Sequence, residues 1–165
     1  MFKINFREIL LSTLVILLTF LIDRISKIYI IKIAELDSTV DIYLTPFLNF
    51  YLIWNKGIAF GLLSFNQTFI YNVITTIIIV ILFVILVMIC RSKGLKRYSL
   101  LFVFGGSIGN LFDRIYYSAV PDFIDFHINN FHWFIFNVAD IFISLGIITL
   151  IFIEIFSNKK NKKID

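Results

Sequence analysis

Four long apolar segments restrict what this chain can fold into more than any other feature of its sequence. They extend over about residues 9–31, 69–90, 98–115 and 137–156, and the second segment carries no charged residue. A helix needs about 20 apolar residues to cross a hydrocarbon core of about 30 Å. We therefore predict an all-α membrane protein with four transmembrane helices, forming one integral membrane domain over residues 1–165.

The overall composition also indicates a bilayer as the solvent. Hydrophobic residues make up 59% of the 165 residues and charged residues only 16%, which is more apolar side chain than a small soluble domain can bury. The first segment follows Lys3 and Arg7, as in a signal peptide. However, no small-x-small cleavage site follows, and apolar residues resume after Lys27, so we expect a retained span.

The basic residues predict the orientation of the spans. Two lysines or arginines precede the first span, four fill the link between the second and third, and four follow the last. With four spans, these ten of the fifteen basic residues share one side, which the positive-inside rule makes cytoplasmic. Both termini are then cytoplasmic. The same placement at span ends argues against nucleic acid as the partner that the net charge of +4 would suggest.

Two loops are expected on the outer side. The first, about 32–68, mixes β-branched and aromatic residues with Pro46, Asn55 and Gly57. This pattern predicts short strands and turns, hence a small β-rich extracytoplasmic cradle between the first and second helices. The second, about 116–136, is rich in aromatic residues, which is typical of a segment at the level of the lipid headgroups.

Polar residues gather at the outer ends of the predicted spans. Within each span they are three or four positions apart, so they share a helix face. Two further acids lie in the second loop. The span residues are Asp23, Lys27, Asn110, Asp113, Arg114, Asn137 and Asp140, and the loop acids are Asp122 and Asp125.

Each group also has a purely structural interpretation. Asp23 and Lys27 are consistent with an anchoring ion pair at the membrane interface. Asn137 is a good N-cap residue, and Asp140 three positions later complements the helix dipole. Considered singly, these interpretations stay open. Ionisable residues at membrane depth are nevertheless candidates for a functional site, and several converge here on one side of a small protein.

Other conspicuous residues favour structural roles. Gly105 and Gly109 form a small-xxx-small step typical of helix packing. Cys90 is the only cysteine, which excludes an internal disulfide, and its apolar surroundings favour inert packing or lipid contact. His127 and His132 are five apart without an HExxH arrangement, so we predict no metal site.

The hydrolytic chemistry most available to this set of residues uses paired aspartates. Asp122 and Asp140 are tied to ends of spans that are expected to be neighbours, whereas no Ser–His or Cys–His pair is offered by the same region. A non-enzymatic alternative is a small transporter or assembly subunit with Asp23, Asp113 and Asp140 as an ion relay. Transporters usually place such groups near the midplane and often contain internal repeats. Here the acids cluster at one interface and no repeat is visible.

At these positions the sequence resembles the lipoprotein signal peptidases, the type II signal peptidases of bacteria. The resemblance runs through nearly the whole chain, and the order and spacing of its blocks make it specific. The blocks are "DRISK" (23–27), "NKGIAFG" (55–61), "GGSIGNLFDR" (105–114), "PDFID" (121–125) and "FNVAD" (136–140). It implies an aspartyl endopeptidase that removes signal peptides before a cysteine carrying diacylglycerol.

The resemblance also implies roles for individual residues. The catalytic pair falls on Asp122 and Asp140. The positions that would bind substrate or support the site are Asp23, Lys27, Asn55, Gly57, Asn110, Asp113, Arg114, Asn137 and Ala139.

Two departures from the family pattern leave these polar groups in place. The family commonly has two alanines where this chain has Ile58 and Ala59, and often a valine where Pro121 stands. Asp125 leaves some ambiguity about which loop acid acts, and the family pattern favours Asp122. The implied partners are lipid-modified prolipoproteins and the phospholipid bilayer of the bacterial cytoplasmic membrane, with the protein as a monomer.

Repulsion between two adjacent carboxylates makes ionisation of both unfavourable, so the pair is expected to hold one proton and titrate as a unit. The ionised member would take a proton from water while the protonated member donates to the scissile carbonyl. Neither a metal, another cofactor nor a covalent intermediate is needed. The sequence leaves open which aspartate carries the proton.

Overall fold

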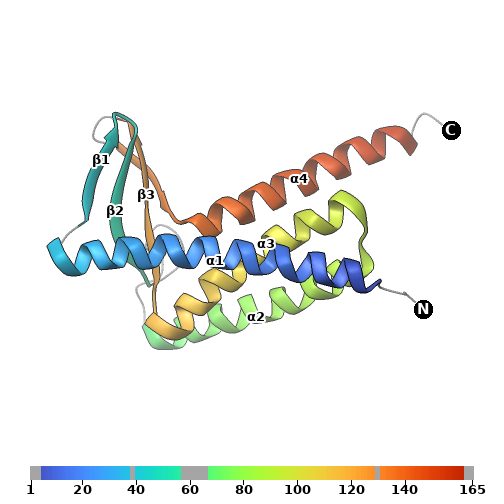
Figure 1. The fold of residues 1–165 in the computed structure, drawn as a ribbon, viewed down its shortest axis with the longest axis horizontal. Coiled ribbons are helices and arrows are strands. Elements are labelled where there is room, and N and C mark those ends of the chain that lie inside the picture. Colours follow the sequence, from blue (N-terminus) through green and yellow to red (C-terminus); the bar gives the residue numbers. More distant parts are fainter. Residues whose placement is uncertain (1–4, 38–39, 57–66, 129–130, 162–165) are drawn as a thin grey trace.

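Four long helices and one small sheet make up the part of the chain that the structure describes. The structure, a computed structural model, describes residues 5–37, 40–56, 67–128 and 131–161. Figure 1 shows the sheet at one end of the helices, with the start of α1 and the end of α4 toward the other end. In chain order the elements are α1 (Phe6–Asp37), β1 (Asp41–Thr45), β2 (Leu48–Asn55), α2 (Gln67–Arg91), α3 (Gly94–Tyr117), β3 (Val120–Ile128), β4 (Phe131–Phe136) and α4 (Val138–Asn161).

The helices coincide with the four apolar segments of the sequence. Three of them contain stretches long and apolar enough to cross a membrane, namely Phe6–Leu36, Phe69–Arg91 and Val138–Ser157. The third segment also forms a helix, α3, but α3 is not among these candidates. Three of the four predicted spans therefore have the length and composition of a membrane helix. The remaining span, over 98–115, stays a prediction.

The position of α3 explains its weaker apolar character. α3 packs against each of α1, α2 and α4, so it is the central helix of the group. Its buried residues include serine, glycine and an aspartate as well as leucine and valine. A helix surrounded by other helices needs small residues for close approach more than it needs apolar side chains for lipid.

The glycine step of α3 is a helix contact, as predicted. A Cβ at Gly105 would collide with the Thr19 side chain of α1. One turn later, a Cβ at Gly109 would come within 2.5 Å of the Asp23 carboxylate, also on α1. The glycines therefore let α1 approach α3 at the level where Asp23 lies.

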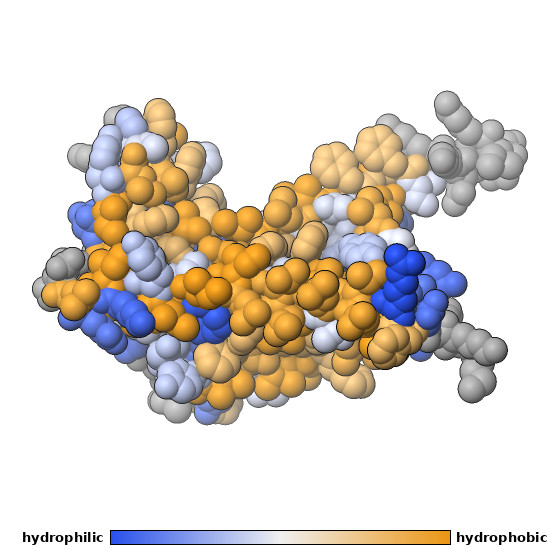
Figure 2. All heavy atoms as spheres, in the orientation of Figure 1, coloured by the Kyte–Doolittle hydropathy of each residue, from blue (hydrophilic) through white to orange (hydrophobic). Residues whose placement is uncertain are grey.

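Large apolar side chains face outward along the helices. Ile77, Phe83 and Val84 of α2 and Ile151 and Phe152 of α4 are all more than half exposed. Figure 2 shows hydrophobic residues over most of the helical surface, with hydrophilic residues mainly near the two ends. A soluble protein rarely exposes so large an apolar surface, whereas lipid is a suitable solvent for it.

The sheet corrects the expectation of an all-α fold with strands confined to the first loop. Its four antiparallel strands follow the order β1-β2-β3-β4, and β3 and β4 come from the second loop, 116–136. Aromatic residues are frequent both at membrane interfaces and in strands, so composition did not separate the two possibilities. Strand pairing shows that the second loop belongs to the sheet, because β3 lies between β2 and β4. Phe123 of β3 also packs against Ile30 and Val40.

Candidate active site

Asn137 and Asp140 form a reciprocal cap at the start of α4. The Asn137 side-chain oxygen accepts a hydrogen bond from the Asp140 backbone N–H at 3.2 Å. The Asp140 carboxylate in turn accepts one from the Asn137 backbone N–H at 3.1 Å. This arrangement is a capping box with Asn and Asp in place of the usual residues. The capping role predicted for both residues is confirmed, and it leaves the second Asp140 oxygen available for other contacts.

Asp122 lies on β3, next to the start of α4. Its carboxylate accepts hydrogen bonds from the side-chain amide of Asn137 at 2.6 Å and from that of Asn55, on β2, at 3.0 Å. Burial raises the pKa of the Asp122 carboxyl to about 6. The Asn55 and Asn137 hydrogen bonds oppose this rise, and the neighbouring charge of Asp140 adds to it.

Asn137 joins the two carboxyl groups. Its side-chain amide donates to Asp122, and its backbone N–H donates to Asp140. Asn137 is itself completely buried, so the link between β3 and α4 is held in place by packing. Two acids that are 18 positions apart in the sequence thus meet around one asparagine.

Lys27 is the centre of a second polar network beneath this pair. The side chain is fully buried and donates to Asp23 at 2.9 Å, to Asn110 at 2.9 Å and to Asp113 at 2.6 Å. All three ammonium protons are therefore used. Asn110 connects this network to Asp140, because its amide group donates a hydrogen bond to the second Asp140 oxygen at 2.8 Å.

Asp23 ties this network to the first turn of α4. One Asp23 oxygen accepts a hydrogen bond from the Ala139 backbone N–H at 3.0 Å, which satisfies a donor that a helix start leaves unpaired. Ala139 is fully buried, and its methyl group lies close to Gly109 of α3. A small residue at this position lets α3 and α4 approach each other.

Arg24 is a member of this network that the sequence analysis did not single out. Its guanidinium is paired with Asp113 at 2.6 Å and with Asp23 at 3.3 Å, and the side chain is buried. Arg24 follows Asp23 directly, so i,i+4 spacing did not indicate it. Its position inside "DRISK" was the available signal.

Arg114 and Gly57 are the remaining residues that were predicted to support the site. Arg114 lies with its guanidinium 5.5 Å from the Tyr71 ring centroid on α2, while the Arg114 backbone carbonyl accepts a hydrogen bond from the Tyr71 hydroxyl. Gly57 lies outside the described residues, as do the neighbouring departures Ile58 and Ala59.

Asp125 is engaged elsewhere on the sheet. Its carboxylate is 2.8 Å from the His132 ring nitrogen and 3.5 Å from that of His127. Asp122, by contrast, bonds with Asn137 and so reaches the start of α4. This difference in contacts favours Asp122 as the loop acid of the candidate site.

The arrangement can polarise water and an amide carbonyl at the same time. It offers two carboxyl groups held by three asparagine side chains. A buried lysine–carboxylate network joins α1 to α3, and Asp23 ties it to α4, which carries Asp140. These are the requirements of general acid–base hydrolysis by paired acids.

Comparisons with known proteins agree with one another. A family model described as signal peptidase (SPase) II matches residues 15–156. The chain is 52% identical over 158 residues to a lipoprotein signal peptidase of Pelagibacter ubique (strain HTCC1062), covering 96% of this chain and 95% of that protein. It is 35% identical over 152 residues to a lipoprotein signal peptidase of Anaplasma phagocytophilum (strain HZ), covering 90% and 94%. A solved bacterial membrane enzyme has a similar fold, with a TM-score of 0.70, 29% identity and coverage of 92% of this chain and 90% of that one.

Proposed function

The chain belongs to the signal peptidase II family, and we propose that it is a membrane aspartyl endopeptidase for diacylglyceryl-modified prolipoproteins. It cleaves the signal peptide just before the lipidated cysteine. Asp122 and Asp140 are the catalytic pair. The observation that carries this assignment is the shared contact of both carboxyl groups with Asn137.

Asp122 acts as the acid and Asp140 as the base in the first step. Burial favours the protonated form of Asp122, while Asp140 lies at a helix N-terminus with hydrogen bonds to both of its oxygens, which suits a negative charge. Asp140 removes a proton from water, whose oxygen attacks the scissile carbonyl carbon. Asp122 gives its proton to the carbonyl oxygen. The tetrahedral intermediate then loses the amine, which leaves with the proton from Asp140, while the Asp122 carboxylate takes back a hydroxyl proton as the carboxylic acid product forms.

The lysine network positions this chemistry and does not perform it. Lys27 and Arg24 neutralise Asp23 and Asp113. Asp23 holds the Ala139 backbone, one position before Asp140. Errors of about 1 Å in the placement of a catalytic group can lower a rate about 100-fold. The gain in rate from a rigid support of this kind therefore offsets the free energy needed to bury its charged groups.

The site works at the outer rim of the membrane. In this arrangement all four helices span the bilayer, both termini are cytoplasmic, and the sheet lies at the extracytoplasmic surface. Three observations support it: the apolar helices, the basic residues between the second and third apolar segments, and the position of the start of α1 and the end of α4 away from the sheet. α3 spans as the central helix, with its polar residues turned toward α1 and α4.

This location gives a reason for the choice of substrate. A prolipoprotein has its signal helix in the bilayer and its cleavage point near the outer surface, where Asp122 and Asp140 lie. The acyl chains on its cysteine stay in lipid while the peptide enters the site. The enzyme acts as a monomer on this substrate and needs no nucleic acid.

The experiment that tests the function compares two matched precursors. The purified protein in detergent micelles is given the same prolipoprotein peptide with and without diacylglycerol on its cysteine. Cleavage of the lipidated form alone, just before the cysteine, is expected. A liposome assay for ion flux runs in parallel, and flux without cleavage would support the transporter alternative and overturn the proposal.

A further inference from the structure

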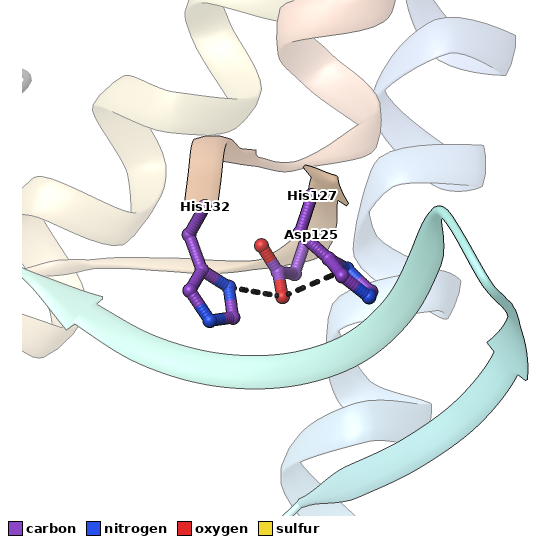
Figure 3. Close-up of side chains that lie close together, drawn as sticks. All are labelled: Asp125, His127 and His132. Carbon is purple, nitrogen blue, oxygen red and sulfur yellow. Dashed lines mark hydrogen bonds and ion pairs between the residues drawn. The ribbon is translucent and has the colours of Figure 1, made fainter. Parts of the chain in front are cut away.

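The acid and the two histidines on the hairpin of β3 and β4 form a compact cluster separate from the catalytic pair. One ligand atom from each of Asp125, His127 and His132 lies within 4.8 Å of the other two. Figure 3 shows the three side chains directed toward one another from β3 and β4. Neither histidine has a role in the proposed hydrolysis.

Strand geometry explains why residues five positions apart meet here. His127 and His132 are register partners across the hairpin, so their side chains share a face of the sheet. Asp125 is two positions before His127 on β3, and alternate residues of a strand point to the same side. A search for helical ligand spacing such as HExxH does not detect such a cluster.

Two polar atoms of the cluster are left without a hydrogen bond. The second oxygen of Asp125 and the Nδ1 of His127 are buried and have no hydrogen-bond partner among the described residues. Asp125 is only 1% exposed. Burying unpaired polar atoms is costly, and a cation placed between the three side chains would satisfy the His127 nitrogen, which faces the other Asp125 oxygen at 3.5 Å.

We propose that Asp125, His127 and His132 bind a divalent transition-metal ion, for which zinc is the best match. Zinc accepts imidazole nitrogen and carboxylate oxygen at about 2.0–2.2 Å, and a tetrahedral site places ligand atoms about 3.4 Å apart. The Asp125 carboxylate is already 2.8 Å and 3.5 Å from the two ring nitrogens. Small side-chain rotations therefore convert the cluster into a three-ligand site. His132 is more than half exposed, so water reaches the fourth position.

Such a site would brace the sheet and not cut peptide bonds. Its ligands come from both strands of one hairpin, and β3 also carries Asp122 three positions before Asp125. Metal binding therefore stabilises the native state by linkage and restricts opening of β4 from β3. The catalytic carboxyl groups make their hydrogen bonds with Asn55, Asn110 and Asn137, which the cluster does not include.

The test measures zinc binding to the full-length protein in detergent micelles, after chelator treatment and removal of any histidine tag. Isothermal titration should give one saturable zinc per chain, and zinc should raise the thermal unfolding temperature. Cobalt(II) should produce visible absorption bands of a four-coordinate site. His132→Ala, at an exposed position, should weaken binding by more than about 10-fold and remove the thermal shift.

Three comparison variants make the result specific. Trp133→Ala, next to His132 on β4 and half exposed, should bind zinc as the wild type does. Cys90→Ser and Asp122→Asn should do so as well, because neither residue belongs to the cluster. Unchanged affinity in His132→Ala, or no saturable binding by the wild type, would overturn the proposal. Loss of prolipoprotein cleavage in EDTA with recovery in zinc would contradict its separation from catalysis.

Discussion

Asp140 lies where a negative charge is favoured by the helix dipole but disfavoured by the apolar surroundings. The structure combines both interpretations of this residue: one carboxylate oxygen caps α4 and the other binds Asn110. The cap fixes the carboxylate relative to the backbone. Asp122 then approaches through the shared Asn137. The cap thus already orients Asp140 for the catalytic role that we propose for it.

The raised pKa of Asp122 makes a prediction for the pH dependence of cleavage. The pair works when one carboxyl is protonated, and a rise of pH through about 6 removes the proton from Asp122 in the free enzyme. We expect kcat/KM for a lipid-modified precursor to fall on the alkaline side with an apparent pKa of about 6 that belongs to the pair. Initial rates in buffers of constant ionic strength measure it. A profile that stays flat through this range contradicts Asp122 as the acid.

Lys27 is predicted to be the most sensitive position of the buried network. Replacement by methionine leaves Asp23 and Asp113 with less neutralising charge in a buried site. Loss of one partner from a buried pair typically costs about 3–5 kcal/mol. We expect Lys27→Met to lower the free energy of unfolding in micelles by about this amount, measured by denaturant titration.

A partly exposed ion pair of the same protein supplies the control for Lys27. Arg97 and Glu8 are 2.8 Å apart, and the Glu8 side chain is half exposed. Pairs of this kind contribute about 0–1 kcal/mol, so Glu8→Gln should change the unfolding free energy little. Equal effects of the two substitutions would show that burial of the lysine network does not matter.

At the level of elements, the contact between α1 and α3 controls where Asp23 lies. A methyl group at Gly109 would come within 2.5 Å of the Asp23 carboxylate, which must then move away from the Ala139 N–H. We expect Gly109→Ala to lower the cleavage rate by about 10- to 100-fold. Ser107→Ala, in the same turn of α3, is the matched control. Wild-type activity in Gly109→Ala would contradict the positioning role of Asp23.

The helices were predictable from the sequence because their signal is local. Uncharged runs of membrane length, such as most of α2, leave few alternatives to a helix. The capping of α4 by Asn137 was also predictable, since the cap and its partner are three positions apart. The i,i+4 pair of Asp23 and Lys27 follows from the same helical spacing, and the structure contains it.

The strands of the second loop were not predictable because their signal is not local. β3 is held by β2, whose Ile53 pairs with Asp122 from nearly 70 positions away in the chain. The meeting of His127 and His132 depends on the hairpin register. Helical spacing carries no information about either contact. The pairing of Arg24 with Asp113 was missed for the same reason, because it joins α1 to α3.

At the scale of the whole molecule, the buried polar groups of the candidate site lie at the end of the helices that carries the sheet. The helix sides are apolar, and the sheet lies at the end opposite the start of α1 and the end of α4. A bilayer around the helices thus leaves the candidate site at one surface. The proposed orientation places this end of the molecule at the extracytoplasmic surface.

Cysteine labelling tests that topology in cells. In a Cys90→Ser background, we expect Tyr43→Cys, on exposed β1, to react with a membrane-impermeant maleimide from outside. Lys93→Cys, in the link between α2 and α3, should react only after the membrane is permeabilised. The reverse pattern would invert the orientation, and labelling of both from outside would contradict α2, the helix between the two positions, as a membrane span.

The central claim is that Asp122 and Asp140 together hydrolyse the precursor. The most direct measurement is cleavage of a diacylglyceryl-modified precursor by purified Asp122→Asn and Asp140→Asn, each first shown to be folded and inserted like the wild type. Asp125→Asn, the other acid of β3, is the matched control and should keep its activity. We predict that both catalytic variants lose cleavage entirely. Retained processing by either of them would contradict the assigned pair.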